Sequence, residues 1–203
     1  LTIVGVLLFS GQDYNFNNGT LELKGGLLDV DNNTTIASNI ILSGNSSIDV
    51  AQDITLTYSG ASIDISDYQL TLLGSGTISN TYSVLLSNIN SLLVLAGDIT
   101  INLIEVTGNS ASGKGIRVES ADAEVTTLDL AAELRLTFTD NSYVLDVGTL
   151  NVNSAAQLTG DGDGGLLVVT DLFQEVASEY VLTLHDIDVK VINQIELEFA
   201  NQI

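Results

Sequence analysis

The sequence lacks cysteine, proline, methionine and tryptophan altogether. Without cysteine, the chain has neither a disulfide framework nor a thiolate metal site. Without proline, every residue keeps its backbone N–H donor, which permits uninterrupted strand ladders. Because methionine is absent, Leu1 is not an initiator residue, and we expect a processed product or an excised segment.

Positive charge is scarce, since 5 basic residues stand against 26 acidic ones and the formal net charge is -21. Nucleic acid and anionic membranes are repelled by such a surface, so we expect neither as a partner. The acidity favours either solubility with protection against edge pairing, or adaptation to divalent cations or high salt. Chains of this composition are common outside the cell, so we expect an extracellular or cell-surface protein.

Apolar residues make up 45% of the chain and are mainly aliphatic. Residues 47–59, SIDVAQDITLTYS, have close variants at 62–74 and 127–139. Each copy contains two short apolar alternations joined by a few polar residues, which predicts two short strands and a turn. A unit this small cannot bury its apolar face alone, so stacked copies in a parallel β-solenoid are expected. A β-sandwich or jelly roll of pilin-like kind is the alternative, because alternation does not fix parallel pairing.

Other segments depart from this repeat. Residues 1–9 are apolar throughout but too short to span a membrane, which predicts a strand buried on both sides. It is the first core strand, a strand donated to a neighbouring subunit, or the core of a truncated signal peptide. Residues 107–123 are small, polar and charged, which predicts a long loop. That loop is either solvated or contacts a partner through Lys114 and Arg117.

The C-terminal region has a different pattern. Apolar spacing over residues 170–180, with Thr170 as the N-cap, predicts a short helix. The long alternation that follows predicts one hairpin or two half-buried strands. We therefore predict a solenoid over residues 1–170 and an alternating-strand cap or docking element over 171–203.

Candidate chemistry is limited. Asp29, Asp49, Asp64, Asp129 and Asp146 each lie between aliphatic residues, which predicts an outward polar ladder rather than a catalytic row. The single histidine, His185, is expected on the surface of a strand. Asp161 and Asp163 flank Gly162, which predicts either a calcium site or an ordinary acidic turn. No other cofactor is indicated.

The phrases SIDISDYQLTLLGSGTIS and TLDLAAELRLTFT resemble the coils of bacterial surface adhesins of the filamentous-haemagglutinin and autotransporter-passenger kind. The resemblance covers roughly residues 20–165 and rests on pattern more than on fixed residues. It implies a right-handed parallel β-helix, secreted and displayed outside the cell.

The expected function is that of a non-catalytic structural protein, a subunit or segment of a surface filament, biofilm fibre or adhesin. Homo-oligomers or filaments are the expected assembly, with a glycan or cell-surface ligand as a further partner. The alternative is a β-helix that binds polysaccharide or cleaves it as a lyase or hydrolase. The residues expected to carry assembly are the apolar ones of both terminal segments, namely Leu1, Ile3, Val4, Val6, Leu7, Leu8, Phe9, Ile195, Leu197 and Phe199.

Overall fold

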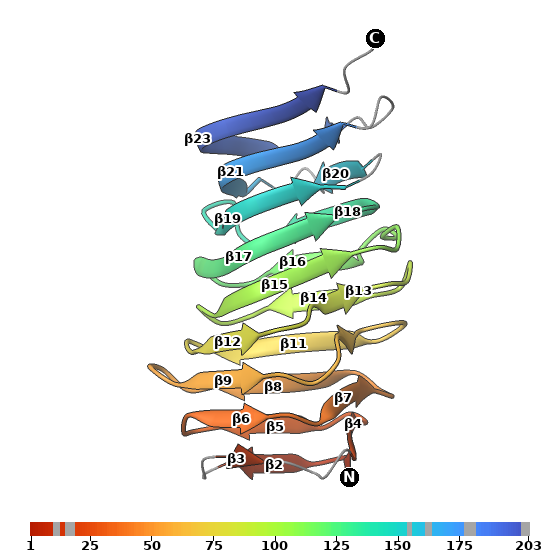
Figure 1. Ribbon diagram of the computed structural model, residues 1–203, viewed down its shortest axis with the longest axis vertical. Helices are drawn as coiled ribbons and strands as arrows, with labels where there is room; N and C mark the ends of the chain where they lie inside the picture. The colour runs from red at the N-terminus through yellow and green to blue at the C-terminus, as the bar shows by residue number, and fades with distance from the viewer. Residues whose placement is uncertain (10–12, 15–18, 154–155, 161–163, 177–181, 200–203) are drawn as a thin grey trace.

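The computed structural model describes residues 1–9, 13–14, 19–153, 156–160, 164–176 and 182–199, which form a parallel β-solenoid of about 8 turns (Figure 1). The described residues contain strands and no helix. The chain climbs from the N-terminus at the bottom of Figure 1, and the long strands at its front run from left to right. Strands at the back run the other way, so the coil is right-handed. The predicted parallel β-helix is confirmed, and the sandwich alternative is excluded.

Each coil has three faces. Face 1 is the nine-stranded sheet. Its strands are β2 (Val6–Phe9), β5 (Leu27–Val30), β8 (Ser46–Val50), β11 (Gln69–Gly74), β14 (Leu92–Leu95), β16 (Gly115–Val118), β18 (Glu133–Phe138), β20 (Ala156–Gly160) and β22 (Leu182–His185).

Faces 2 and 3 begin as separate short strands. Face 2 starts with β3 (Asp13–Tyr14), β6 (Thr34–Ile36), β9 (Thr55–Tyr58) and β12 (Thr77–Asn80). Face 3 starts with β1 (Thr2–Ile3), β4 (Thr20–Leu23), β7 (Asn39–Leu42), β10 (Ile63–Asp64) and β13 (Val84–Leu86). In the later coils one long strand crosses both faces, as β15 (Thr100–Val106), β17 (Asp122–Leu130), β19 (Val144–Val152), β21 (Leu166–Val176) and β23 (Asp188–Phe199).

The coil period differs from the spacing of the sequence repeat. Register partners on face 1 lie 20 residues apart at Val30 and Val50, and 26 apart at Leu158 and Leu184. Each of the copies at 47–59 and 62–74 forms two strands, but the first strand of one copy does not pair with the first strand of the other. The first strand of the first copy, β8, pairs with β11, the second strand of the second copy. The repeated sequence pattern therefore specifies a pair of strands, but it does not specify which faces of the solenoid they occupy.

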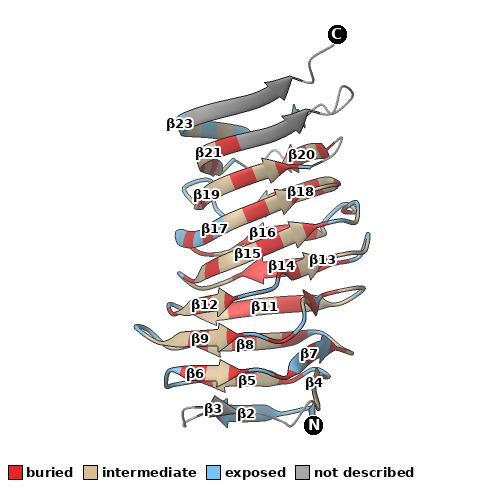
Figure 2. Ribbon diagram, in the orientation of Figure 1, coloured by how far each residue is buried: buried red, intermediate tan, exposed pale blue. Residues whose placement is uncertain are grey.

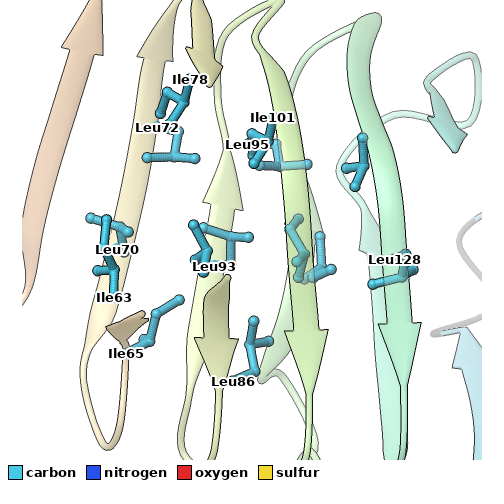
Figure 3. Packing of buried hydrophobic residues seen from close by; sticks show 14 of the residues in the cluster. Ile63, Ile65, Leu70, Leu72, Ile78, Leu86, Leu93, Leu95, Ile101 and Leu128 are labelled. Carbon is cyan, nitrogen blue, oxygen red and sulfur yellow. The ribbon is translucent and has the colours of Figure 1, made fainter. Parts of the chain in front are cut away.

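The core is a set of aliphatic rows that run along the solenoid axis. Within a strand, every second side chain points inward and is buried, as Ser46, Ile48 and Val50 are in β8. Figure 2 shows buried residues alternating with half-buried ones on coil after coil. Figure 3 shows the rows side by side, with Leu72 beside Leu95. Each coil adds one layer of side chains to these rows, so the core continues along the axis and excludes water from every coil.

The long strands bend where face 2 meets face 3, and one residue per coil at this corner leaves the ladder. These unpaired residues are Asn102, Thr126, Gly148 and Thr170. The extra residue shifts the alternation, so buried residues on either side of it are three apart instead of two. Val125 and Leu128 show this spacing, as do Val169 and Leu172.

In the C-terminal region the predicted helix is wrong, and of the two alternatives for the tail the structure has two strands and not a hairpin. Residues 166–176 form β21, so the expected helix is absent from 170–176, and the rest of it lies outside the described residues. β22 pairs in parallel with β20, and β23 pairs in parallel with β21 on the other sheet. These two strands therefore do not form a hairpin but continue the solenoid. The proposed boundary at 170/171 falls inside β21, and a capping role for the last coil stays a prediction.

The N-terminal segment is not one strand buried on both sides. Residues 1–9 form β1 on face 3 and β2 on face 1, with a turn between them. Phe9 points into the core and is buried, whereas Val6 points outward and is 68% exposed. The segment thus forms the start of the first coil.

Candidate functional site

The repeated aspartates point outward, as predicted, but they lie on different faces. Asp29 and Asp49 are register partners on face 1. Asp129 on β17 is in register with Glu105 on one side and Asn151 on the other. Asp146 is in register with Glu124. The aspartates therefore occur in short stacks and do not form one continuous row.

Neutral donors from neighbouring coils satisfy many of the carboxylates. Ser87 Oγ donates to Asp64, and Asn151 Nδ2 donates to Asp129 at 2.7 Å. Ser83 Oγ donates to Glu105, and Thr100 Oγ1 donates to Glu124. These bonds stabilise the ionised form of the carboxylates. They indicate a structural role for the outward acids.

Ionisation of the Asp29 carboxyl is less favourable in the folded protein than in a free aspartate. Burial raises its pKa, and the neighbouring carboxylates of Asp31 and Asp49 raise that pKa further. Glu22 shows the opposite effect, because hydrogen bonds from Ser43 and Thr2 lower its pKa. Ionisation of Asp29, which is stacked on Asp49 in face 1, therefore opposes folding.

We expect Asp29→Asn to raise the stability of the protein at neutral pH. The folded-state pKa of Asp29 is raised, so its ionisation costs stability above that pKa and costs nothing below the unfolded value. Like charges directly opposite each other on paired strands cost roughly 0.2–1 kcal/mol. Urea unfolding at pH 7 should show a gain of this size, which disappears at pH 3. An equal gain at both pH values would contradict the charge explanation.

Candidate metal ligands are not grouped in the described residues. No group of three or more His, Asp and Glu side chains there is arranged to hold an ion. Asp161 and Asp163 lie outside the described residues, so their calcium site stays a prediction. His185 lies on the surface of β22 as predicted, with its Nδ1 atom 2.8 Å from the Asp186 carboxylate.

The predicted loop at 107–123 is wrong, because its middle forms β16 and its last two residues begin β17. Arg117 lies in β16 on face 1, where its Nε atom is 2.6 Å from the Glu119 carboxylate. Lys114 ends the short turn before β16, and its backbone N–H donates to the Ala111 carbonyl. Sequence reasoning missed Arg135, one strand further on, which pairs with Glu133 and donates from Nε to the Ser110 carbonyl. Arg117 thus pairs with a glutamate that directly follows its strand, and Arg135 pairs with a glutamate of its own strand.

The predicted assembly residues fall into three groups. Ile3 and Phe9 belong to the core, and Leu7 packs partly against it. Leu1, Val4, Val6 and Leu8 are exposed on the first coil. Ile195, Leu197 and Phe199 lie in β23, where Ile195 is in register with Leu172 of β21, but their side chains lie outside the described set. Those predicted assembly residues that the structure shows to be exposed therefore lie at the N-terminal end of the solenoid.

The corner between faces 2 and 3 holds two shallow cavities that the sequence did not indicate. One, of about 460 Å³, is lined by turn residues of three early coils, namely Ala37, Asn39, Ser59, Gly60, Ala61, Ser62 and Tyr82. The other, of about 400 Å³, is lined by residues of four later coils, namely Glu124, Val125, Thr126, Asp146, Gly148, Thr170 and Ile192. Only the coil of Asn102 separates them. We call this line of residues the corner groove.

The early half of the corner groove exists because the ladder of face 3 is interrupted. β7 and β10 lie beside each other but do not pair as strands. Side chains replace the missing ladder bonds. The buried Tyr58 hydroxyl accepts from the Ile40 N–H at 3.0 Å, and Asn39 Oδ1 accepts from the Ala61 N–H at 3.0 Å. Such irregular register cannot be predicted from an alternating pattern, because the pattern does not say which strands pair.

No protein-family model, curated protein or solved structure matches the chain. The described residues also contain no helix long and apolar enough to cross a membrane. Function is therefore argued from the surfaces of the solenoid themselves.

Proposed function

We propose that this protein is a non-catalytic, extracellular structural protein, a subunit or segment of a surface filament or adhesin whose solenoids stack end to end. The observation that carries the proposal is the pair of open ends. β2 and β22 are the terminal strands of face 1, and β3 and β23 are those of the eleven-stranded sheet. Within the part of the chain that the structure describes, each of these strands has an edge to which no strand is paired, and such an edge favours pairing with a further coil or another chain.

Apolar exposure at both ends supports this proposal. Leu184 in β22 occupies the core position of Leu158 one coil earlier, yet it is 48% exposed. At the other end Leu1 and Val4 are exposed on the first coil, and Leu7, an inward position of β2, is only partly buried. Stacking a second copy in the same orientation places β2 on β22 and continues the parallel sheet. The apolar rows then become continuous across the junction.

Features of the side faces favour a structural role over catalysis. A lyase needs a base beside its bound sugar, and the basic side chains Arg117 and Arg135 lie on face 1, paired to glutamates. No basic residue lines either described cavity of the corner groove. The carboxylates that accept hydrogen bonds from Ser, Thr and Asn are suited to a hydrated, stable rod. Absence of cysteine and a charge of -21 are consistent with an extracellular location.

Electron microscopy of the purified chain, with and without a calcium chelator, tests this proposal. We expect filaments with a regular axial repeat, and we expect Leu184→Lys to abolish them by placing a charge at an apolar junction. The matched control is Ile89→Lys, since Ile89 is 54% exposed and lies away from both ends. Its filaments should be unchanged. Isolated short rods from the unmodified chain would contradict end-to-end assembly, and loss of filaments on chelation would point to a calcium-dependent junction.

A further inference from the structure

The corner groove has the direction and the length of a site for a linear polymer. Its two cavities lie on the same corner with the coil of Asn102 between them, so a line through both runs along the solenoid axis and across the strands. Neighbouring strands are about 4.8 Å apart, so the seven steps from β7 to β23 cover about 34 Å. A ligand that fills both cavities is therefore extended and several units long.

The lining of the groove selects the chemistry of that polymer. The early cavity offers the Tyr82 ring, which is 53% exposed, beside the amide of Asn39 and the hydroxyls of Ser59 and Ser62. An exposed aromatic ring gives an apolar platform, and the surrounding polar groups fix orientation by hydrogen bonds. This combination matches a sugar ring, which has an apolar face and a hydroxylated edge.

The lining of the later cavity is acidic and therefore discriminates against negatively charged polymers. Glu124 and Asp146, register partners on β17 and β19, both line it and are both exposed. Carboxylates accept hydrogen bonds from sugar hydroxyls and repel acidic polymers. No cationic side chain lines either described cavity to offset that repulsion. Uronic-acid and sulfated chains are therefore disfavoured.

The geometry points to a binding site for a linear neutral polysaccharide along the corner groove, with Tyr82 as its stacking platform. The site does not depend on end-to-end assembly, because its residues lie on the side of the rod. In a filament, the same groove would be repeated in every subunit, so many weak contacts would act together. That arrangement would give an adhesive surface for neutral glycans.

Calorimetric titration with cellohexaose, hexagalacturonate and hexalysine tests the site. We expect binding of cellohexaose, no binding of hexagalacturonate, and weaker binding of cellotriose than of cellohexaose. Tyr82→Ala should lower the affinity for cellohexaose at least tenfold, as base-stacking aromatics do for nucleic acids at about 1–3 kcal/mol per ring. Ile89→Ala, the control at an exposed apolar residue outside the groove, should leave the affinity unchanged.

Several results would overturn the assignment. They are no detectable binding of cellohexaose, equal losses in Tyr82→Ala and Ile89→Ala, or tighter binding of hexalysine, which would indicate a basic peptide. Microscopy of Tyr82→Ala separates this inference from the proposed function. Normal filaments with lost sugar binding would support both, whereas filaments from an unmodified chain that binds no sugar would overturn only the groove.

Discussion

Gly97→Ala is expected to destabilise the solenoid by about 3 kcal/mol or more, the upper end of what overpacking costs. Gly97 lies in the turn between β14 and β15, directly beside Gly74 of the preceding coil. A Cβ atom at Gly97 would overlap the Gly74 carbonyl oxygen and lie 2.6 Å from the Gly74 nitrogen. Both atoms belong to the backbone, so no side chain can rotate away. The two coils would have to separate at this corner, which would weaken their ladder.

Gly5→Ala is the matched control, because a Cβ at Gly5 has no neighbouring atom within 4 Å. We expect its unfolding free energy to stay within about 0.5 kcal/mol of the unmodified chain. Urea unfolding followed by circular dichroism measures both variants. Failure of Gly97→Ala to fold agrees with the prediction if Gly5→Ala folds normally. Equal stability of the two variants would show that coil stacking at Gly74 is not as tight as the structure indicates.

Alternation in the sequence, together with the recurrence of a small unit, predicted the fold. Ile48, Val50 and Leu56 lie at the inward positions of β8 and β9, where they are buried, and Asp49 points outward between two of them. This period-two pattern depends only on local geometry, since successive side chains of a strand point to opposite faces. The absence of proline and the small size of each unit then favoured stacked coils over a sandwich.

Pairing between coils was not predictable in the same way. The sequence copies at 47–59 and 62–74 suggested a stacking step of 15 residues, whereas the structure pairs Ile48 with Leu72. Strands on all three faces have the same aliphatic alternation, so a match between two of them does not show that they are neighbours. Register is set by coil length and corner geometry, which the pattern does not contain.

The wrong helix and the missed site both involve a corner. At Thr170 the strand bends and one residue leaves the ladder, so Val169 and Leu172 are both buried at a spacing of three. The helix itself was predicted from Thr170 as an N-cap and from the apolar spacing of residues 172–180, which does not follow period two. Tyr82, also at this corner, lines the groove close to the place where β7 and β10 do not pair. No sequence pattern marks that gap.

Leu72→Ala is expected to cost about 2–5 kcal/mol, the range found for removing a buried leucine side chain. Leu72 is fully buried in β11, where its register partners are Ile48 on one side and Leu95 on the other. Truncation leaves a cavity in an apolar row, and the neighbouring coils cannot close it because their ladder bonds fix the strand spacing. The loss therefore includes both the transfer term and the cavity term.

The adjacent residue gives an unusually close control. Leu73 lies in the same strand, carries the same side chain and points outward, where it is half-buried and in register with Asp49. Leu73→Ala should cost less than about 1 kcal/mol, because only part of its side-chain surface is removed from water on folding. Thermal and urea unfolding of the two variants compare the inside and outside of one strand directly. Equal losses would mean that β11 is not oriented as described. A large loss confined to Leu72 would show that the apolar rows, and not the outward ladder of polar groups, hold the coils together.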